Sequence, residues 1–592
     1  MKISMKTLVK TFILSVLTLL IVACQPTQSP LSAFIPEDAV GVVYLEDPAG
    51  FLQNTSEFTE GLGLTALTGD KSPQAYFSDL KNLTDGKLDA AWFDLSRPSV
   101  IALLSDSSPI IAVPVKSEDS AGKGLATFLS ESLSLKTQVK DGWVVASGKE
   151  LTLPLTKGFD FTKLSTGSKQ GLRYYLNIPK AMTLGGVSPD QVSGFLDEFM
   201  SEMDGLGTET AVFNKIIGLG IDGLKQLNAL SGSVNLSSVG FNSFADLSFT
   251  PEGTFTELLA RQGQVNGSRE FLKYLPQDYL LGFISNMDSK VWMKEMQEFN
   301  RVLYEAQGLS PELVTLMTDY QDVLLTSLGN RIALSFDVDY DLKALSSMDL
   351  AKGLKLYFVG VMDLKDTKAY REKTNEYFSS SIMKDNISSL LKESGVPITL
   401  DLITDLGKKD GVLDYDSVKF KFGVNSGGTA DSETTQVIAM LSQLDLQLFM
   451  AYKNDKTYLA LGSGALEGLK ALVEKDAYDG KTWAQGGLEN LEAAYPDNAH
   501  LAWNFNVNRL LQLIRKVPEA SMVPAGITGS PGLLGYVQLD KGVIKTGTAW
   551  NFKELEALVK PFSAFIPLML GNLGGSQSQE MDYDDEFEDE DD

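Results

Sequence analysis

Three segments of the chain open with the same turn and strand pattern, and this internal repetition constrains the fold more than any other feature of the sequence. In each segment an aromatic residue and a proline precede an aspartate, and a run of apolar residues follows. Proline with a nearby aspartate is typical of a turn, and the apolar run after it is typical of a strand. The three segments are residues 34–45, 274–284 and 495–505.

A second recurring element, at residues 137–148 and 446–462, has the pattern of a β-hairpin. In the first segment Asp141-Gly142 separates two strand-like runs and is a strong short-range hairpin signal, and in the second Asn454-Asp455 occupies the same place. In both segments an aromatic residue opens the return strand and a glycine ends it. We therefore expect two equivalent hairpins.

A third recurring element occupies residues 232–249 and 535–552. Both segments alternate with period two around a glycine-containing turn, and each leads into a helical segment. Because many of the expected strands pair as hairpins, antiparallel sheets are favoured over a parallel one. The sequence thus predicts an α+β fold made of degenerate repeated modules of antiparallel sheet with packed helices.

The repeats and the composition of both ends predict a division of the chain into six segments. These are a signal peptide (1–23), a tether (24–33), two larger α+β modules (34–268 and 269–490), a shorter C-terminal repeat segment that completes a sheet (491–570), and a flexible linker with an acidic tail (571–592).

Cys24, the only cysteine among 592 residues, follows a segment with the features of a secretory signal. Basic residues precede an apolar run at 11–22, which is shorter than the roughly 20 residues needed to span a bilayer. Ile21-Val22-Ala23-Cys24 resembles the lipobox of bacterial lipoproteins. The resemblance implies that a signal peptidase recognises Ile21, Val22 and Ala23, and that Cys24 becomes the lipidated amino terminus.

The lipobox resemblance also implies a location in the cell envelope. Gln25 follows the cysteine, which by the same resemblance favours the outer membrane, with the body on its periplasmic face or at the cell surface. Three acyl chains hold a protein more firmly than the marginal anchorage of one chain. Because the chain has only one cysteine, no internal disulfide can form, and stability must come from burial of apolar side chains.

The chain is strongly acidic, with 77 acidic and 51 basic side chains and a net charge of -26. Nucleic-acid binding needs a basic face for phosphate contacts, so we exclude nucleic acid as a partner. Residues 581–592 alone hold nine acidic side chains and no basic one. Such a block either stays solvated or binds a basic protein partner. The candidate binding residues of this tail are Asp582, Tyr583, Asp584, Asp585, Glu586, Phe587, Glu588 and Asp589.

The order of turns and hairpins over residues 34–560 resembles a bacterial family catalogued as domain of unknown function 3352. Its members are exported or membrane-anchored and open on a proline–acidic–alanine turn before a strand, as Pro36-Glu37-Asp38-Ala39 does here. They also carry hairpins that end in glycine. The resemblance implies an envelope protein of α+β type, and it brings no activity and no catalytic residue to this chain.

Two patterns resemble catalytic or cofactor sites but have simpler explanations. Residues 218–223 show the spaced glycines of a dinucleotide-binding loop, yet they run into a glycine-rich hairpin instead of a long helix. His500, the only histidine, lies in a strand-like segment where the other two repeats carry Val40 and Leu280. We interpret it as a strand residue and not as the base of a catalytic triad.

Asp337, Asp339 and Asp341 alternate as in the first half of a calcium loop. Leu342 and Met348 occupy the positions where that loop needs glycine and glutamate, so it is not an EF-hand. We expect these aspartates on the solvent face of a strand.

These observations favour a non-enzymatic protein that is anchored by lipid in the cell envelope and has a binding or structural role. An alternative is a carrier that encloses a lipid or another hydrophobic ligand in an apolar pocket. A third hypothesis, a hydrolase of envelope polymer, needs two carboxylates in one cleft, and the sequence singles out no pair. We expect no cofactor, and the expected partners are the membrane and a basic protein.

Overall fold

The computed structural model describes most of the chain between residues 30 and 563. The described ranges, apart from a few single positions between them, are residues 30–65, 71–164, 168–188, 222–263, 265–288, 309–347, 350–384, 398–411, 413–424, 446–462, 464–483, 496–520 and 532–563.

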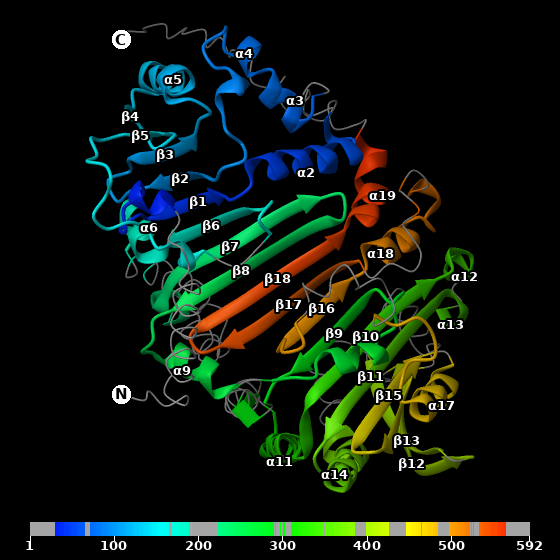
Figure 1. The fold of residues 1–592 in the computed structure, drawn as a ribbon. Coiled ribbons are helices and arrows are strands. Elements are labelled where there is room, and N and C mark those ends of the chain that lie inside the picture. Colours follow the sequence, from blue (N-terminus) through cyan, green and yellow to red (C-terminus); the bar gives the residue numbers. More distant parts are fainter. Residues whose placement is uncertain are drawn as a thin grey trace, which may run out of the picture.

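The eighteen described strands form one continuous sheet in which every pairing is antiparallel (Figure 1). The predicted α+β fold class is therefore confirmed. From one edge to the other the strand order is β4-β5-β3-β2-β1-β6-β7-β8-β18-β17-β16-β9-β10-β11-β15-β14-β13-β12.

The strands are β1 (Gly41–Leu45), β2 (Ser99–Leu103), β3 (Pro109–Pro114), β4 (Lys136–Lys140), β5 (Trp143–Ser147), β6 (Leu172–Asn177), β7 (Leu227–Ser237), β8 (Gly240–Phe249), β9 (Leu281–Asn286), β10 (Leu328–Tyr340), β11 (Leu354–Leu364), β12 (Ile398–Asp410), β13 (Leu413–Val424), β14 (Leu446–Lys453), β15 (Lys456–Gly462), β16 (Leu501–Phe505), β17 (Leu533–Asp540) and β18 (Val543–Asn551).

The described helices are α2 (Pro48–Gly61), α3 (Pro73–Ser78), α4 (Leu80–Leu83), α5 (Lys123–Leu133), α6 (Ile178–Leu184), α9 (Thr254–Arg261), α11 (Pro311–Ser327), α12 (Leu342–Ser346), α13 (Leu350–Gly353), α14 (Thr367–Ser379), α17 (Ala465–Lys475), α18 (Val507–Ile514) and α19 (Phe552–Ser563), and the 3-10 helix η7 (Arg269–Tyr274) precedes β9.

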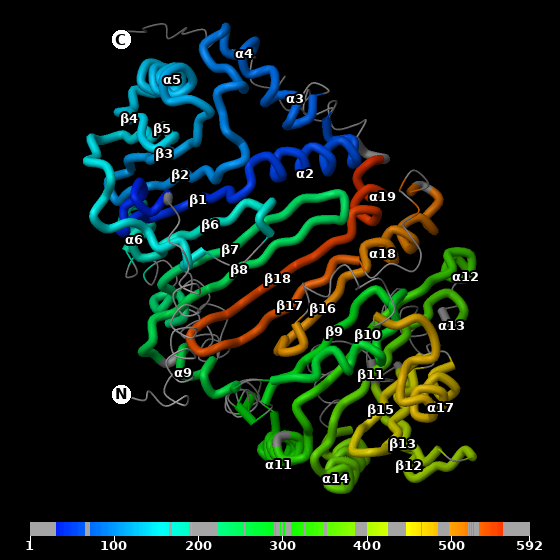
Figure 2. The backbone as a smooth tube through the Cα atoms, in the orientation of Figure 1, coloured from blue at the N-terminus to red at the C-terminus, as the bar shows by residue number. Residues whose placement is uncertain are grey.

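The two halves of the sheet have the same strand order. In the first repeat (residues 41–249) the order is β4-β5-β3-β2-β1-β6-β7-β8, and in the second (residues 281–551) it is β14-β15-β11-β10-β9-β16-β17-β18. β8 and β18 pair antiparallel, so a pseudo-twofold axis relates the repeats. Figure 2 shows β18, near the end of the chain, beside β8 from its middle.

Both predicted hairpins are present, and they occupy equivalent places as β4–β5 and β14–β15. Asp141 and Gly142 have φ of 52° and 77°, and Asn454 and Asp455 have φ of 51° and 56°. Positive φ at both central residues is what a two-residue turn of this kind requires, because its twist then matches that of the strands.

The third turn-and-strand segment is not a third copy of the first two. β1 and β9 occupy equivalent positions, whereas β16 lies between β9 and β17, the position that β6 has in the first repeat. The C-terminal strands β16–β18 thus complete the sheet of the second repeat.

The second repeat carries two additions that the first lacks. Residues 104–108 link β2 to β3, whereas residues 341–353, which include α12 and α13, link β10 to β11. The hairpin β12–β13 lies between α14 and β14, where the first repeat passes directly from α5 to β4. These additions are local elaborations of a duplicated framework.

Polar caps start the helices that follow the equivalent strands. The side chain of Asp47 accepts a hydrogen bond from an N–H of the first turn of α2, and Asn177 and Asn506 do the same for α6 and α18. Ser310 caps α11 and is followed by proline at the first helical position. A cap of this type satisfies one of the N–H groups that have no partner within the helix.

One face of the sheet buries a separate core in each repeat. In the first, Phe34, Ile35 and Phe159 pack against strand residues such as Val42. In the second, residues of η7 and α17 and the indole of Trp483 pack against β9, β10 and β11. Helices cover parts of the other face: α5 lies over β5, α2 and α19 lie over one end of β7, β8 and β18, and α14 lies over β12–β15.

Candidate binding site

The face of the sheet opposite the two main cores carries no charged side chain within the paired stretches of the described strands from β2 to β10. Because directly paired residues point to the same side, one row can be followed through both repeats. It reads Ile101, Val43, Tyr174, Gly232, Ala245, Thr546, Val537, Leu501, Ser285 and Ile332. We call this surface the uncharged face.

Large apolar side chains on the uncharged face are open to solvent at β9 and β10. Leu281, Phe283 and Phe336 are 43%, 36% and 37% exposed. They are neighbours, because Leu281 pairs with Phe336 on one side and with Phe505 on the other. The equivalent part of the first repeat exposes Val43 and Ile101. Clustered exposed apolar side chains are typical of interaction surfaces.

Aromatic rings lie over glycines at equivalent places of the uncharged face. Tyr174 of β6 pairs with Gly232 of β7, and Trp503 of β16 pairs with Gly535 of β17. A Cβ atom at either glycine would come within 2.3 Å of the aromatic side chain. The missing side chains let the rings lie flat on the sheet, which keeps the middle of this face shallow.

Ionic contacts tie α18 to the end of β10. Arg509 donates to both carboxylate oxygens of Asp337 and to the carbonyl of Val338. Its guanidinium also lies 3.9 Å from Asp339, to which Lys516 donates a hydrogen bond. Burial raises the pKa of Asp337, and the hydrogen bonds from Arg509 oppose that rise. These contacts fix the first turn of α18, and the segment that follows the helix, beside β10.

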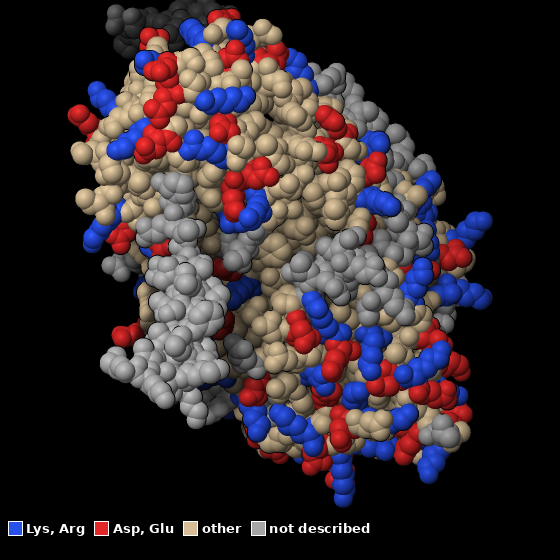
Figure 3. Space-filling model, viewed as in Figure 1, with Lys and Arg blue, Asp and Glu red and all other residues tan. Residues whose placement is uncertain are grey.

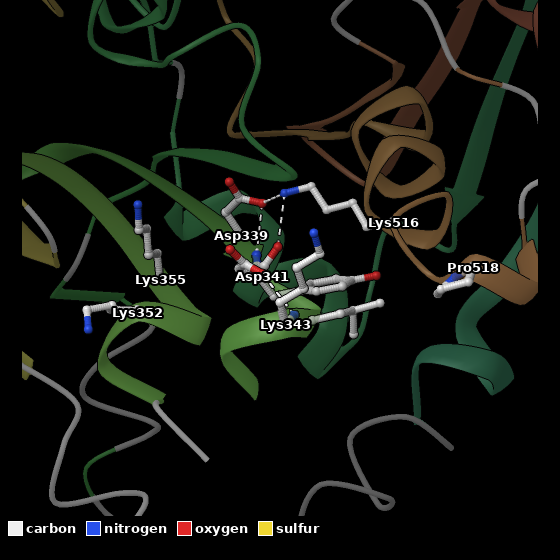
Figure 4. Close-up of a pocket in the computed structure, with 9 residues that line it drawn as sticks. Asp339, Asp341, Lys343, Lys352, Lys355, Lys516 and Pro518 are labelled. Carbon is white, nitrogen blue, oxygen red and sulfur yellow. Dashed lines mark hydrogen bonds and ion pairs between the residues drawn. The ribbon is translucent and has the colours of Figure 1, made fainter. Parts of the chain in front are cut away.

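A hollow of about 610 Å³ lies between the end of β10, the start of β11 and the segment after α18. Four lysines line it, and we call it the lysine pocket (Figure 4). Lys352 and Lys355 lie on one side and Lys516 on the other, with Lys343 between them. The remaining lining residues are Asp339, Tyr340, Asp341, Leu342 and Pro518.

The lysine pocket and the uncharged face meet at Tyr340. Phe336, Val338 and Tyr340 alternate along β10 and share one side of it, and Tyr340 also lines the pocket. The Tyr340 hydroxyl donates a hydrogen bond to the carbonyl of Leu513, and Lys516 lies 5.6 Å from its ring centroid. A strand rises about 3.3 Å per residue, so Phe336 lies about 13 Å from Tyr340 along β10.

Elsewhere on the second repeat the surface is densely charged. In Figure 3 lysine, arginine, aspartate and glutamate side chains crowd the lower part of the molecule. One of the ion pairs is buried: Asp416 accepts hydrogen bonds from Arg371, Asn375 and the Gly407 N–H. Although burial raises the pKa of Asp416, these donors bring it below its ordinary value.

His500 has the structural role that the sequence predicts. It is 1% exposed, its Nδ1 accepts a hydrogen bond from the Leu539 N–H, and its Nε2 therefore donates to the carbonyl of Gly263. Burial lowers the pKa of the imidazole. Both ring nitrogens bind the backbone, so the ring has no nitrogen left to activate a nucleophile.

The glycine pattern at 218–223 is not a dinucleotide loop. Residues 222–226 are helical and lead directly into β7, which pairs antiparallel with β6 and β8. A dinucleotide loop instead follows a strand of a parallel sheet and opens a helix. Residues 218–221 lie outside the described part of the chain.

The expectation that three alternating aspartates lie on a solvent face is wrong. The side chain of Asp337 is only 8% exposed, because α18 packs against it through Arg509. Asp339 is partly covered by Lys516. Asp341 is not in the strand, since it caps α12 by accepting hydrogen bonds from the N–H groups of Lys343 and Ala344.

Other predicted sites fall outside the described residues. Cys24, its recognition residues Ile21, Val22 and Ala23, and the acidic tail at 582–589 belong to this group. In the described parts of the chain, no group of three or more His, Cys, Asp and Glu side chains is placed to hold a metal ion. None of the described helices combines the length and apolar character needed to cross a membrane.

Sequence reasoning missed both parts of the candidate site. The lysines of the pocket come from two segments about 160 positions apart in a chain whose net charge is negative. A local signal was available, because three of the four lie between residues 343 and 355. The uncharged face had a signal too: on β9, Leu281 and Phe283 alternate with buried Gly282 and Ile284, so residues 281–284 present no polar side chain on either side of the strand.

No family model, no curated protein and no solved structure matches the chain. The resemblances to the lipobox and to the family of unknown function therefore rest on the sequence patterns alone, and the functional argument rests on the geometry of the sheet and the pocket.

Proposed function

We propose that the protein is a non-enzymatic binding protein of the cell envelope, anchored by lipid at Cys24, and that it binds the acyl chains of a lipid on the uncharged face. The observation that carries the proposal is the exposed apolar cluster of Leu281, Phe283 and Phe336 on a face without charged side chains. Leaving such residues in water costs roughly 25 cal/mol for each Å² of apolar surface, and a bound acyl chain removes that cost.

Three features support this proposal over a hydrolase. The only histidine is held by two backbone groups, and the lysine pocket presents lysines where a carboxylate enzyme needs two free carboxylates. Asp339 and Asp341, the acidic residues of the pocket, already bind Lys516 and the start of α12. The arrangement therefore suits binding better than acid–base chemistry.

The anchor is tested first, on the full chain in a bacterial host. We expect radioactive palmitate to label the protein and the label to disappear in Cys24→Ala, which should leave the outer-membrane fraction. If the Cys24→Ala protein still fractionates with the outer membrane, the anchor proposal is wrong.

The binding surface is tested with the Cys24→Ala protein, purified without detergent. We expect organic extraction and mass spectrometry to find co-purified lipid, and Phe283→Asp with Phe336→Asp to remove most of it. The control is Leu133→Asp, because Leu133 is also an exposed large apolar residue but lies on α5, away from this cluster. Equal lipid in the double variant and the control would contradict the proposal, provided that circular dichroism shows both to be folded.

A carrier that moves lipid between membranes is the second candidate. The exposure of the apolar cluster favours it, because a ligand on a face of this kind can leave sideways without opening a closed cavity. We expect a carrier to exchange radioactive lipid between two vesicle populations in minutes, whereas a protein that only holds lipid would not. The acidic tail would then serve a separate contact, which a pull-down with and without residues 581–592 tests.

A further inference from the structure

We propose that the lysine pocket binds a phosphate group. This inference deepens the proposed function by naming the chemistry at the polar end of the ligand, and it rests on that function only where the phosphate belongs to a lipid. Three features of the pocket support phosphate binding: its charge balance, its formation by an added segment, and its junction with the uncharged face.

The charge of the pocket is opposite to that of the protein. Four lysines and two aspartates line it, in a chain with a net charge of -26. Asp339 is already paired with Lys516. Among the described residues, no ion pair involves Lys343 or Lys355, and both are exposed. Ammonium groups that line the same hollow repel each other, and an anion bound between them replaces that repulsion with attraction.

The pocket is not needed to connect its two strands. The equivalent pair in the first repeat, β2 and β3, is linked by residues 104–108 alone. In the second repeat, the link at 341–353 supplies Asp341, Leu342, Lys343 and Lys352, and Lys355 lies just beyond it on β11. The link in the second repeat is thus eight residues longer than the short turn that suffices in the first. Because the added residues bring lysines to one hollow, the link points to a role in binding.

The geometry favours phosphate within a larger molecule. A hollow of about 610 Å³ is much larger than inorganic phosphate needs. Lysine ammonium groups bind phosphate as point charges with several rotatable N–H donors, so they can close around its oxygens from different sides. Lys355 and Lys516 lie on opposite sides of the hollow in Figure 4, as such closure requires. From Tyr340 at the pocket, β10 runs back to Phe336 on the uncharged face, so a molecule bound at both places would lie along this strand.

Two sources of phosphate fit this chemistry, namely the headgroup of an anionic glycerophospholipid and a soluble phosphate ester. Binding is measured on the Cys24→Ala full chain with glycerol 3-phosphate by calorimetry, and with vesicles by co-sedimentation. The vesicles are of phosphatidylcholine alone or with phosphatidylglycerol. Because the whole protein is strongly acidic, anionic vesicles repel it unless a local basic site binds them.

The key variant is Lys343→Glu with Lys355→Glu, and the matched control is Lys87→Glu with Lys136→Glu, two exposed lysines of the first repeat. We expect the wild type and the control to bind phosphatidylglycerol vesicles better than phosphatidylcholine vesicles, and the key variant to bind them at least about tenfold more weakly. Binding to glycerol 3-phosphate should fall in parallel. Equal binding by the key variant and the control would overturn the inference.

A second variant replaces residues 341–353 with residues 104–108, the link of the equivalent strands. We expect it to fold, because the first repeat closes the same hairpin in this way, and to lose phosphate binding. Phe283→Asp with Phe336→Asp separates this inference from the proposed function: it should lose co-purified lipid but keep its affinity for glycerol 3-phosphate. If this double variant loses its co-purified lipid but the wild type does not bind glycerol 3-phosphate, the proposal for the lysine pocket is wrong and the proposal for the uncharged face stands.

Discussion

Arg509 binds Asp337 through three hydrogen bonds, at 3.0, 3.2 and 2.9 Å, and so joins α18 to β10 across 172 positions of the chain. The carboxylate is nearly buried, and Arg509 is its charged partner. We expect Arg509→Met to lower the free energy of unfolding by about 3–5 kcal/mol, because it leaves a buried charge unpaired. Urea unfolding followed by tryptophan fluorescence measures the change.

Two comparisons sharpen this prediction. Adding Asp337→Leu to Arg509→Met should recover most of the lost stability, since the buried charge is then removed as well. Lys516→Met should cost at most about 1 kcal/mol, because the Lys516–Asp339 pair is partly exposed and screened by water. A small effect of Arg509→Met alone would show that Asp337 is neutral in the folded protein.

Glu554 should make stability depend on pH near neutrality. Burial raises the pKa of Glu554 to about 7, although the Gly532 N–H and the Trp550 indole donate hydrogen bonds to it. A carboxyl group whose folded pKa is raised contributes its full stability below its unfolded pKa near 4.5, and that contribution disappears as pH rises through about 7. A shift of this size corresponds to about 3 kcal/mol.

The measurement is the unfolding free energy at several pH values between 4 and 8 for the wild type and Glu554→Gln. The neutral amide cannot ionise, so the difference between the two proteins should change in favour of Glu554→Gln as pH rises. Parallel profiles would mean that Glu554 has the same pKa in the folded and unfolded chains.

Adding a glycine to the turn of one equivalent hairpin and removing the glycine from the turn of the other should have opposite effects on stability. Asp455 has φ of 56°, a left-handed conformation that costs an ordinary residue roughly 1 kcal/mol. Asp455→Gly should therefore raise the free energy of unfolding by about 0.5–1 kcal/mol and raise the melting temperature slightly. Gly142→Ala should lower it, because Gly142 has φ of 77° and an added Cβ would lie 2.5 Å from Arg97. Calorimetry measures the melting temperatures of both variants against that of the wild type. Changes opposite in sign to these would contradict the turn conformations described.

Gly535→Val should perturb the uncharged face without disturbing the main cores. Its Cβ would lie 2.2 Å from the Trp503 ring, so the ring must leave its place on the sheet. We expect a loss of about 1–3 kcal/mol and a red shift of the tryptophan emission. Gly407→Val is the control for changing a strand glycine, since a Cβ there meets no atom within 4 Å, although φ of 62° adds strain. An unchanged emission in Gly535→Val would show that Trp503 is mobile.

Local signals in the sequence predict the hairpins and the fold class, because a two-residue turn is set by its own residues, as at Asp141-Gly142. They do not predict which hairpins become neighbours. The turn at 495–505 looks like those at 34–45 and 274–284, yet β16 takes the place of β6, since position in the sheet is set by long-range packing. Local similarity therefore suggested three copies where the sheet has two.

The candidate site escaped prediction for the same reason. Lys516 reaches Lys343 and Lys355 only because Arg509 holds α18 against β10. The alternation of Asp337 and Asp339 shows that they share a side of the strand, but not that a distant helix covers that side. By contrast, the interpretation of His500 as a structural residue needed only its apolar counterparts Val40 and Leu280; the structure buries His500 directly before β16, although not within the strand.

The pairing of β8 with β18 has a consequence for how the protein is made. Thr546 and Ala245, which meet at the centre of this pairing, are 301 positions apart. A chain that emerges from its amino end can complete the first repeat early, but β8 then has an unpaired edge until nearly the whole chain has appeared. Unpaired strand edges pair readily with strands of other chains, so the first repeat is prone to aggregate until β18 has been synthesised. We expect a chaperone that shields strand edges to matter most during this interval.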